Sequence, residues 1–361
     1  MRLSALPPMS APKENRSATL KDVARVAGVH FTTVSMALRD HPSIPEATRE
    51  RIRAVAKEVG YARNPVFSAL AQFHVHGRQR AAAPKLGYII NRDRHAHSDF
   101  FRSPGVYFDG AREQARLLGY TLEVMQLGAG YHDSRSLERH LRASGVNGVV
   151  IAGFEPGNDP MALNWDDYAV VKIDSMHSPP AAIVVGNDHR QDVRMAFRQL
   201  GAKGYRRIGL AISRADEEST QHRYSAGYFI EQRSQPLEDQ VPPLVFPLAT
   251  TRDDAVLQLG SWVRQHDIHA VLSHSPAIDQ LLTAAGLRVP DDVACACLAL
   301  TEHDVPDQLA GIRPNYRTVG ARAISQLATQ LKVGDRGVPE FSPQTYVPSK
   351  WQDGRSAPGR S

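Results

Sequence analysis

Apolar residues recur at helical spacing in three short segments near the start of the chain. The pattern predicts helices from Thr19 to residue 27, from Phe31 to about residue 39 and from about Pro45 to residue 59, with Gly28 in the turn between the first two. Two short helices joined by a tight glycine turn and backed by a third are typical of a helix-turn-helix. The outer face of the second helix is expected to carry Phe31, Thr32, Thr33, Ser35, Met36 and Arg39.

From about residue 85 the pattern changes, and apolar runs of strand length alternate with amphipathic helical segments. The predicted strands are LGYII, TLEVMQL, GVVIAG, AVVKID, AAIVV, RIGLAI, AVLSH and VACACLAL. Such alternation is typical of parallel sheets wrapped by helices. The fold class is therefore α/β with an all-α head, and the body is expected to form two lobes with a ligand cleft where strand ends meet. We expect the first lobe to hold about 85–200 plus 315–338.

Composition agrees with a globular protein. The chain has 361 residues, of which 42% are apolar and 22% charged. It contains neither a signal-peptide core nor a run of about 18 apolar residues, so we predict a cytoplasmic protein without a membrane partner. The two cysteines, Cys295 and Cys297, are two apart in an apolar run and are interpreted as reduced core thiols.

Charge is distributed unevenly. Residues 1–85 hold 14 Lys and Arg against 6 Asp and Glu, a net charge of +8, and the rest of the chain therefore carries 5 − 8 = −3. A basic head on a mildly acidic body suggests an anionic partner, such as nucleic acid, for the head alone, although charge by itself fits a solvated basic surface equally well.

The head resembles the DNA-binding domain of the lactose-repressor/galactose-repressor (LacI/GalR) family of bacterial transcription regulators. The resemblance is near-continuous from Thr19 to Pro65 and includes L-x-D-V-A-x-x-A-G-V, T-V-S-x-A-L, T-R-E-R-I and G-Y-x-x-N-P. It implies that Phe31, Thr32 and Met36 read base edges in double-stranded operator DNA. The residues implied to contact phosphates are Thr33, Ser35, Arg39, Thr48 and Asn64. Two departures are Met36, where most members have Arg, and His30, where a capping Ser is usual.

The resemblance also implies the domain order. Residues 1–18 are predicted to be a disordered extension, 19–64 the DNA-binding domain, 65–72 a hinge helix and 73–84 a linker. Leu70 matches the leucine that wedges into the minor groove when two hinge helices pair. The effector-binding and dimerisation domain is expected over 85–355, followed by a flexible tail at 356–361.

The body resembles a periplasmic sugar-binding protein, with GYRRIGL, GLRVPDDVA and GIRPNYRTVGARAISQLATQL as its clearest marks. Positions matching effector contacts are Phe100, Phe101, Asp188, Arg223 and Ser275. Charged groups facing an aromatic wall suit a polyol such as a sugar. However, Ser275-Pro276 stands where relatives often have Asn-Asp, and residues 298–301 replace Gly-Tyr-Asp-Asp. Either the effector is unusual or the cleft has become insensitive to ligand.

The sequence contains no G-x-S-x-G, P-loop or dinucleotide-binding motif, so an enzyme is not predicted. The histidine pairs His74/His76 and His95/His97 lack an accompanying Cys or carboxylate cluster, and no metal or other cofactor is predicted. The sequence predicts a homodimeric transcription regulator that binds a pseudo-palindromic operator and responds to a small molecule, and repression is the favoured mode of regulation. An effector-insensitive or architectural DNA-binding protein is the alternative.

Overall fold

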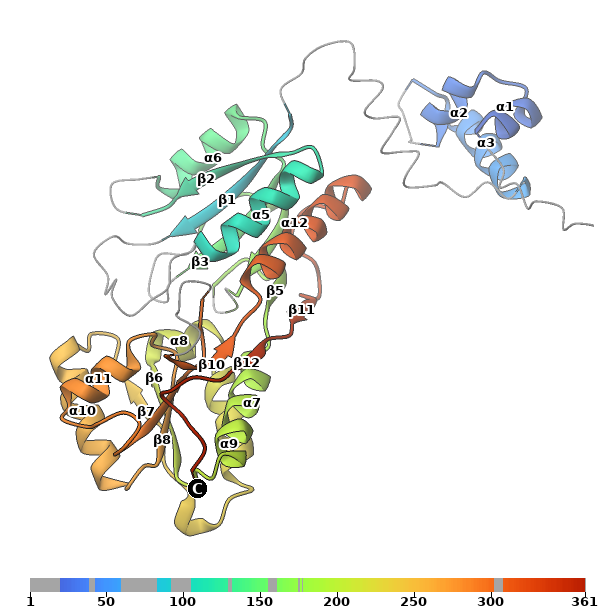
Figure 1. The fold of residues 1–361 in the computed structure, drawn as a ribbon. Coiled ribbons are helices and arrows are strands. Elements are labelled where there is room, and N and C mark those ends of the chain that lie inside the picture. Colours follow the sequence, from blue (N-terminus) through green and yellow to red (C-terminus); the bar gives the residue numbers. More distant parts are fainter. Residues whose placement is uncertain are drawn as a thin grey trace, which may run out of the picture. The chain divides into compact units, whose positions relative to one another are not determined.

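The computed structural model describes residues 20–38, 43–59, 83–91, 105–128, 132–154, 161–174, 176, 178–301 and 308–360. The chain divides into two compact units, residues 1–82 and 83–361, which are considered separately (Figure 1).

The described residues of the first unit form three helices: α1 (Leu20–Ala27), α2 (Phe31–Ala37) and α3 (Glu46–Glu58). Gly28 has a positive φ of 65°, a conformation that glycine adopts without strain, and it ends α1 so that α2 can begin three residues later. Apolar side chains from all three helices form one small core: Val23, Ala24, Ala27, Val34, Ala37, Ile44, Ile52 and Ala56. The three predicted helices and their apolar faces are confirmed.

The second unit begins with a lobe built on a six-stranded parallel sheet in the order β11-β5-β4-β3-β1-β2. Its strands are β1 (Lys85–Asn91), β2 (Thr121–Gln126), β3 (Gly148–Phe154), β4 (Ala169–Ile173), β5 (Ile183–Asn187) and β11 (Gln344–Val347). Helices α5 (Gly105–Leu117) and α12 (Tyr316–Val333) cover one face, and α6 (Ser134–Ala143) covers the other. A short 3-10 helix, η1 (Trp165–Asp167), precedes β4.

The second lobe repeats this plan around a sheet in the order β12-β10-β9-β8-β6-β7, in which only β12 is antiparallel to its neighbour. Its strands are β6 (Ile208–Ser213), β7 (Leu244–Phe246), β8 (Ala270–Ser273), β9 (Ala294–Cys297), β10 (Ala310–Arg313) and β12 (Lys350–Gln352). Its helices are α7 (His189–Ala202), α8 (Arg214–Ser219), α9 (Arg223–Gln232), η2 (Leu237–Asp239), α10 (Arg252–Gln265) and α11 (Ile278–Ala284).

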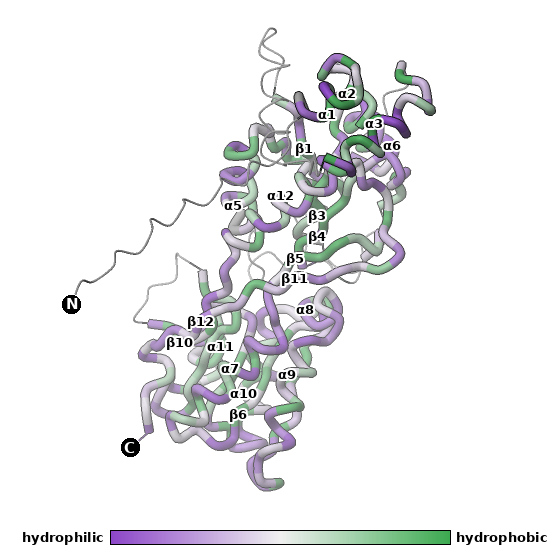
Figure 2. The backbone as a smooth tube through the Cα atoms, turned by 90° about the vertical axis from the view of Figure 1, so that its right-hand side faces the viewer, coloured by the Kyte–Doolittle hydropathy of each residue, from purple (hydrophilic) through white to green (hydrophobic). Residues whose placement is uncertain are grey.

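Each lobe therefore has three layers, with apolar strands between helices. Strands β3 and β4 of the first lobe are themselves hydrophobic along most of their length, as Figure 2 shows. In the second lobe α7 and α9 pack on one face of the sheet, while α10 and α11 pack on the other. Cys295 and Cys297 lie on the latter side as free, fully buried thiols, which confirms their interpretation as core residues.

The division between the lobes differs from the sequence prediction. Helix α7 was assigned to the first lobe, but Val193, Phe197 and Leu200 lie in the core of the second. Strand β11 (Gln344–Val347) lies outside the residues expected for the first lobe, but it pairs with β5 in that lobe. The chain thus crosses between lobes three times, after β5, after β10 and after β11. Periodicity identifies the elements but not the sheet that each one joins.

The C-terminal residues also differ from the prediction of a flexible tail. Ser356 and Ala357 are buried, and the Ser356 hydroxyl donates to the Cys295 carbonyl at 2.8 Å. The Tyr205 hydroxyl donates to the Pro358 carbonyl at 2.7 Å, and the Arg360 amide donates to the Lys203 carbonyl at 2.8 Å. Polar, proline-containing composition favoured a tail, whereas these hydrogen bonds fix residues 356–360 against the second lobe.

Candidate functional site

The N-terminus of α2 presents an ordered group of exposed side chains. Phe31 is 44% exposed, so its ring is available for contact with a partner. The His30 ring lies 4.5 Å from it between centroids, and His30 Nδ1 is 2.9 Å from Thr32 Oγ1. His30 occupies the N-cap position without a side-chain capping bond. Its imidazole instead links the two residues that were predicted to read bases.

The other predicted DNA contacts are distributed over the head. Met36 is half-buried and packs against the head core, so only part of its side chain faces outward. Thr33 is half-buried on α2, and Thr48 is half-buried in the first turn of α3. Ser35 lies within α2. Arg39, Asn64, Leu70 and the predicted hinge helix at 65–72 lie outside the described residues.

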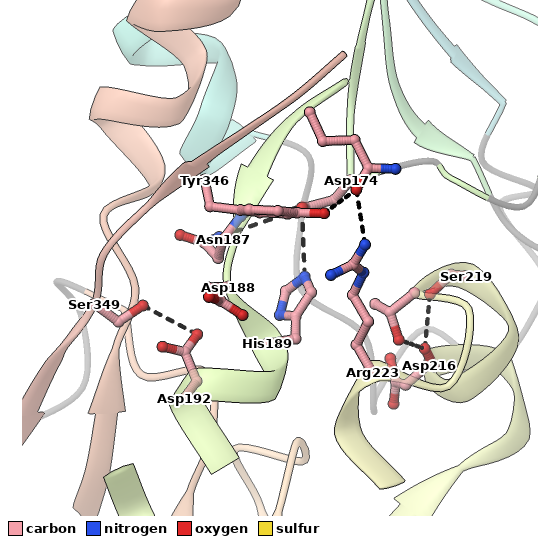
Figure 3. Close-up of polar contacts among 12 residues, drawn as sticks. Asp174, Asn187, Asp188, His189, Asp192, Asp216, Ser219, Arg223, Tyr346 and Ser349 are labelled. Carbon is pink, nitrogen blue, oxygen red and sulfur yellow. Dashed lines mark hydrogen bonds and ion pairs between the residues drawn. The ribbon is translucent and has the colours of Figure 1, made fainter. Parts of the chain in front are cut away.

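The second candidate site is the junction between the two lobes of the body, where strands β4, β5, β6 and β8 end. Asp174 follows β4. Its carboxylate accepts hydrogen bonds from the Tyr107 hydroxyl at 2.7 Å and from the backbone N–H of Asn187 at 3.1 Å. His189, the first residue of α7, approaches it from the second lobe, with 3.4 Å between Nε2 and Oδ1 (Figure 3). Burial lowers the pKa of His189, but Asp174 and neighbouring carboxylates outweigh it and leave that pKa raised. This raised pKa favours an ion pair across the junction.

Aromatic rings occupy the second-lobe side of this junction. The fully buried Tyr224 ring lies between those of His189 and His274, with centroid distances of 4.8 and 5.5 Å. His274 follows β8, and its Nδ1 is 3.2 Å from Asp216 Oδ1. Burial, followed by the charge of Asp216, raises the pKa of the Tyr224 hydroxyl well above its ordinary value. The phenol therefore stays protonated.

Arg223 joins the lobes directly. Its Nη2 donates to Gln344 Oε1 at 2.7 Å, and its guanidinium carbon lies 4.8 Å from the centroid of the Tyr346 ring. Gln344 and Tyr346 belong to β11 of the first lobe, whereas Arg223 begins α9 of the second. Figure 3 shows Arg223 extending toward Tyr346, and a dashed line joins His189 to Asp174. We call the contact of Arg223 with Gln344 and Tyr346 the clasp.

A buried carboxylate lies beside the third crossing of the chain. Asp192 on α7 accepts a hydrogen bond from the Ser349 hydroxyl at 3.0 Å. Burial raises its pKa to about 7, against the lowering effect of His189. The charge at this crossing therefore changes near neutral pH.

The structure brings some of the predicted effector contacts together. Asp188 and Arg223 both lie at the junction, but the Asp188 carboxylate accepts the Gln191 amide at 3.2 Å and so caps α7. The Ser275 hydroxyl accepts the Ala277 amide at 3.3 Å, a local turn contact. Phe100 and Phe101 lie outside the described residues.

Several junction residues were not singled out from the sequence, including Asp174, Tyr224, His274, Gln344 and Tyr346. Asp174 and His274 directly follow strands that were predicted, and ligand sites in such sheets lie beyond the carboxyl ends of strands. Polar residues at those positions were therefore a usable signal. Gln344 and Tyr346 had no such signal, because β11 was not predicted.

Two family models match the chain. The model described as bacterial regulatory proteins, lacI family, matches residues 19–64, and a periplasmic binding protein-like domain matches residues 197–357. The chain therefore carries a DNA-binding head of the lacI type and a periplasmic binding protein-like domain. These matches support a DNA-binding regulator of transcription with an effector-type domain, and the relatives below are regulators rather than enzymes.

Individual relatives agree with these two matches. The HTH-type transcriptional regulator GalR of Salmonella typhimurium is 27% identical over 342 residues, which cover 90% of this chain and 94% of GalR. PtxS of Pseudomonas plecoglossicida is 29% identical over 54% of this chain and 53% of its own.

Solved structures share the fold of this chain. The transcriptional regulator CelR–cellobiose complex has a TM-score of 0.58 at 20% identity, covering 94% of this chain and 99% of that one. The Lac repressor dimer bound to operator and the anti-inducer ONPF has a TM-score of 0.54 at 20% identity, covering 95% of this chain and 100% of that one. The α/β fold class with a helix-turn-helix head is thereby confirmed.

Two features are absent from the described residues. The described residues include no helix that is both long and apolar enough to span a membrane. They also include no group of three or more His, Cys, Asp or Glu side chains placed to hold a metal ion. The pairs His74/His76 and His95/His97 fall outside them.

Proposed function

We propose that the protein is a homodimeric repressor that binds a pseudo-palindromic operator and responds to a small molecule at the lobe junction. The observation that carries the DNA-binding part is the exposed His30–Phe31–Thr32 group at the start of α2. A helix of this kind fits the major groove, where Phe31 suits the methyl group of thymine and Thr32 a base-edge hydrogen bond. The Lac repressor, which shares the fold, was solved as a dimer bound to operator, and this supports the proposal by analogy.

The remaining assignments extend this proposal. Met36 contributes an apolar base contact, and hydroxyl, guanidinium and amide groups hold phosphates: Thr33, Ser35, Arg39, Thr48 and Asn64. Leu70 inserts into the minor groove from the hinge. A two-fold dimer implies two half-sites related by symmetry.

The effector is proposed to bind where the lobes meet. Two buried polar atoms there, Asn187 Oδ1 and Arg223 Nε, have no hydrogen-bond partner in the described part of the chain, whereas His189 Nε2 and His274 Nδ1 face the carboxylates of Asp174 at 3.4 Å and Asp216 at 3.2 Å. Unsatisfied buried polar groups are costly, so a ligand that supplies partners for them gains affinity. A polyol is the first candidate class, and CelR provides a sugar-bound example of the same fold. Lobe movement on binding would alter the geometry of the paired heads.

Selection of bound sequences from a random duplex library tests the DNA-binding proposal. At about 150 mM salt, phosphate attraction alone is weakened and sequence readout dominates. We expect a two-fold symmetric motif. Enrichment of a single asymmetric half-site would contradict the dimer, and salt-sensitive binding with no motif would favour the architectural alternative.

The effector-insensitive alternative also has an observation in its favour. The junction is bridged by the chain's own side chains, through Arg223 with Gln344 and His189 with Asp174. A regulator held closed in this way would bind its operator without any ligand. Release of the selected duplex by a fraction of a bacterial small-molecule extract would decide for an effector, and no release by any fraction would decide against one.

A further inference from the structure

The charged groups of the lobe junction are unequally supplied with partners. Four carboxylates there each accept a hydrogen bond from within the chain. They are Asp174 from Tyr107 and Asn187, Asp188 from Gln191, Asp192 from Ser349, and Asp216 from Ser213. A ligand amine is therefore not needed to satisfy any of them.

The guanidinium of Arg223, in contrast, has fewer hydrogen-bond partners than it has donors. Its Nη2 donates to a neutral acceptor, Gln344 Oε1, and its Nε is buried without a hydrogen-bond partner. No carboxylate of the described residues lies within 4.0 Å of its guanidinium, whereas Arg194 and Arg288 of the same body each have a carboxylate oxygen closer than that. Withdrawing a guanidinium from water without giving it an anionic partner costs free energy, and a bound anion would offset this cost.

The two atoms concerned define the chemistry of the missing partner. Nε and Nη2 form one edge of the guanidinium, and two parallel N–H donors on that edge match the two oxygens of a carboxylate or phosphate. A neutral hydroxyl satisfies only one of them. We propose that the effector of the junction carries an anionic group, a carboxylate or a phosphate, which Arg223 binds through Nε and Nη2. This inference rests on the proposed function, in which a small molecule binds at the junction.

The clasp gives this binding a mechanical consequence. Gln344 Oε1 accepts from both Arg223 Nη2 and the Tyr346 hydroxyl, so one carbonyl oxygen holds both groups. An anion that takes Nη2 displaces Gln344 from Arg223, and β11 of the first lobe loses its polar contact with α9. Anion binding and the clasp therefore compete for the same guanidinium.

The full chain can be tested with simple probes. Thermal unfolding is followed with increasing inorganic phosphate, acetate or glycerol, with chloride adjusted to hold the ionic strength constant. Ligand that binds only the folded state raises the unfolding temperature in a saturable manner. We expect phosphate, acetate or both to do so, and glycerol, as the neutral polyol probe, not to. Stabilisation by phosphate alone identifies a phosphate ester as the effector class, and stabilisation by acetate identifies a carboxylate.

Variants connect the effect to Arg223. Arg223→Lys keeps the charge but loses the paired donors, and we expect at least a tenfold loss of anion affinity. Gln344→Ala removes the competitor, and we expect anion affinity to increase severalfold, which a merely structural role of the clasp would not produce. The matched control is Arg313→Lys, because Arg313 Nε donates to the amide oxygen of Gln352 at 3.0 Å and is already satisfied. This control should bind the probes as wild type does.

The outcomes separate the two proposals. The inference is overturned if neither anion stabilises the protein saturably, or if Arg223→Lys binds them as tightly as wild type. Fractions of a bacterial extract, divided by anion exchange, are then tested for release of the selected operator. Release by the acidic fraction, lost in Arg223→Lys, supports the inference. Release by the neutral fraction alone overturns it while the effector response stands, and release by no fraction removes the effector response itself.

Discussion

His30 shows how one residue can matter without being a direct contact. The position favours a hydroxyl or carboxamide that caps the helix, yet the imidazole makes no capping bond. It lies instead against the Phe31 ring and within hydrogen-bond distance of Thr32 Oγ1. Side chains held in place before binding lose less entropy on binding, so this arrangement favours specific recognition.

The first prediction concerns that arrangement. We expect His30→Ala and Thr32→Val each to weaken binding to the selected operator, with a coupling between them of about 1 kcal/mol, or about fivefold. Non-specific DNA binding should be unchanged, because phosphate contacts dominate it. Fluorescence anisotropy on the four proteins of the cycle measures the coupling. His30→Ala combined with Met36→Leu is the control and should be additive, whereas additivity of the first pair would show that His30 does not position Thr32.

Lys172 is a buried cation in the central strand β4. Its ammonium donates to the carbonyls of Ser178 and Pro180, the latter at 3.1 Å, and burial lowers its pKa to about 8. These bonds fasten residues 178–180 to the strand. Because the unfolded chain retains the ordinary lysine pKa of about 10.4, it binds the proton more tightly than the folded chain does.

A pH dependence follows from that difference. The folded state is penalised below pH 8, and the penalty disappears as the pH rises toward the unfolded pKa. We expect wild type to gain about 2 kcal/mol between pH 7 and pH 10 relative to Lys172→Met, measured by urea unfolding. Lys350→Met, at an exposed lysine of β12, is the control and should parallel wild type. Parallel curves for Lys172→Met would mean that the ammonium is solvated.

Helices α5 and α12 approach each other closely because each has a glycine at the contact. A Cβ atom at Gly320 would lie 2.0 Å from the Tyr107 carbonyl oxygen, and one at Gly110 would lie 1.9 Å from the Arg317 carbonyl oxygen. Both distances are impossible for real atoms, so the two backbones require glycine there. This contact also sets the position of Tyr107, whose hydroxyl holds Asp174 at the junction.

We therefore expect Gly320→Ala to destabilise the body by about 3 kcal/mol through overpacking. Gly201→Ala is the matched control, since Gly201 lies in helix α7 with no atom within 4 Å of an added Cβ. Its substitution should be neutral or stabilise by up to about 1 kcal/mol through helix propensity. Chemical denaturation of both variants measures the difference. Equal stabilities would show that the helices separate readily at Gly320.

Which elements were predictable depends on whether their signal is local. The head helices follow from residues a few positions apart, such as Val34 and Ala37, and the buried strands β3 and β4 follow from apolar runs, of which the one in β4 is broken only by Lys172. Strand β11, with only Val347 buried, has no such run and gains its place by pairing with β5, about 160 residues earlier in the chain. Arg223, an expected effector contact, lies at the junction, but its partners Gln344 and Tyr346 depend on that long-range pairing.

The basic head and the acidic body have different roles in the proposed regulator: the head contacts DNA and the body binds the effector. Among the described residues, the head has a single small core and the body has four clusters of buried apolar residues. One recognition helix presents few side chains to DNA. The proposed dimer would place two heads on one operator, which increases both affinity and selectivity, and its two chains would associate through the larger body.

The last prediction follows from the proposed dimer. At about 150 mM salt, we expect the selected duplex with both half-sites to bind at least about 100-fold more tightly than one with a scrambled half-site, because the second head binds at a high effective concentration. Anisotropy titrations measure the ratio, and sedimentation equilibrium gives the number of chains on each duplex. A dimer on the complete site with a large ratio supports two-headed recognition. Equal affinities, with one chain on either duplex, would show that a single head reads the operator and that the symmetry of the site is not used.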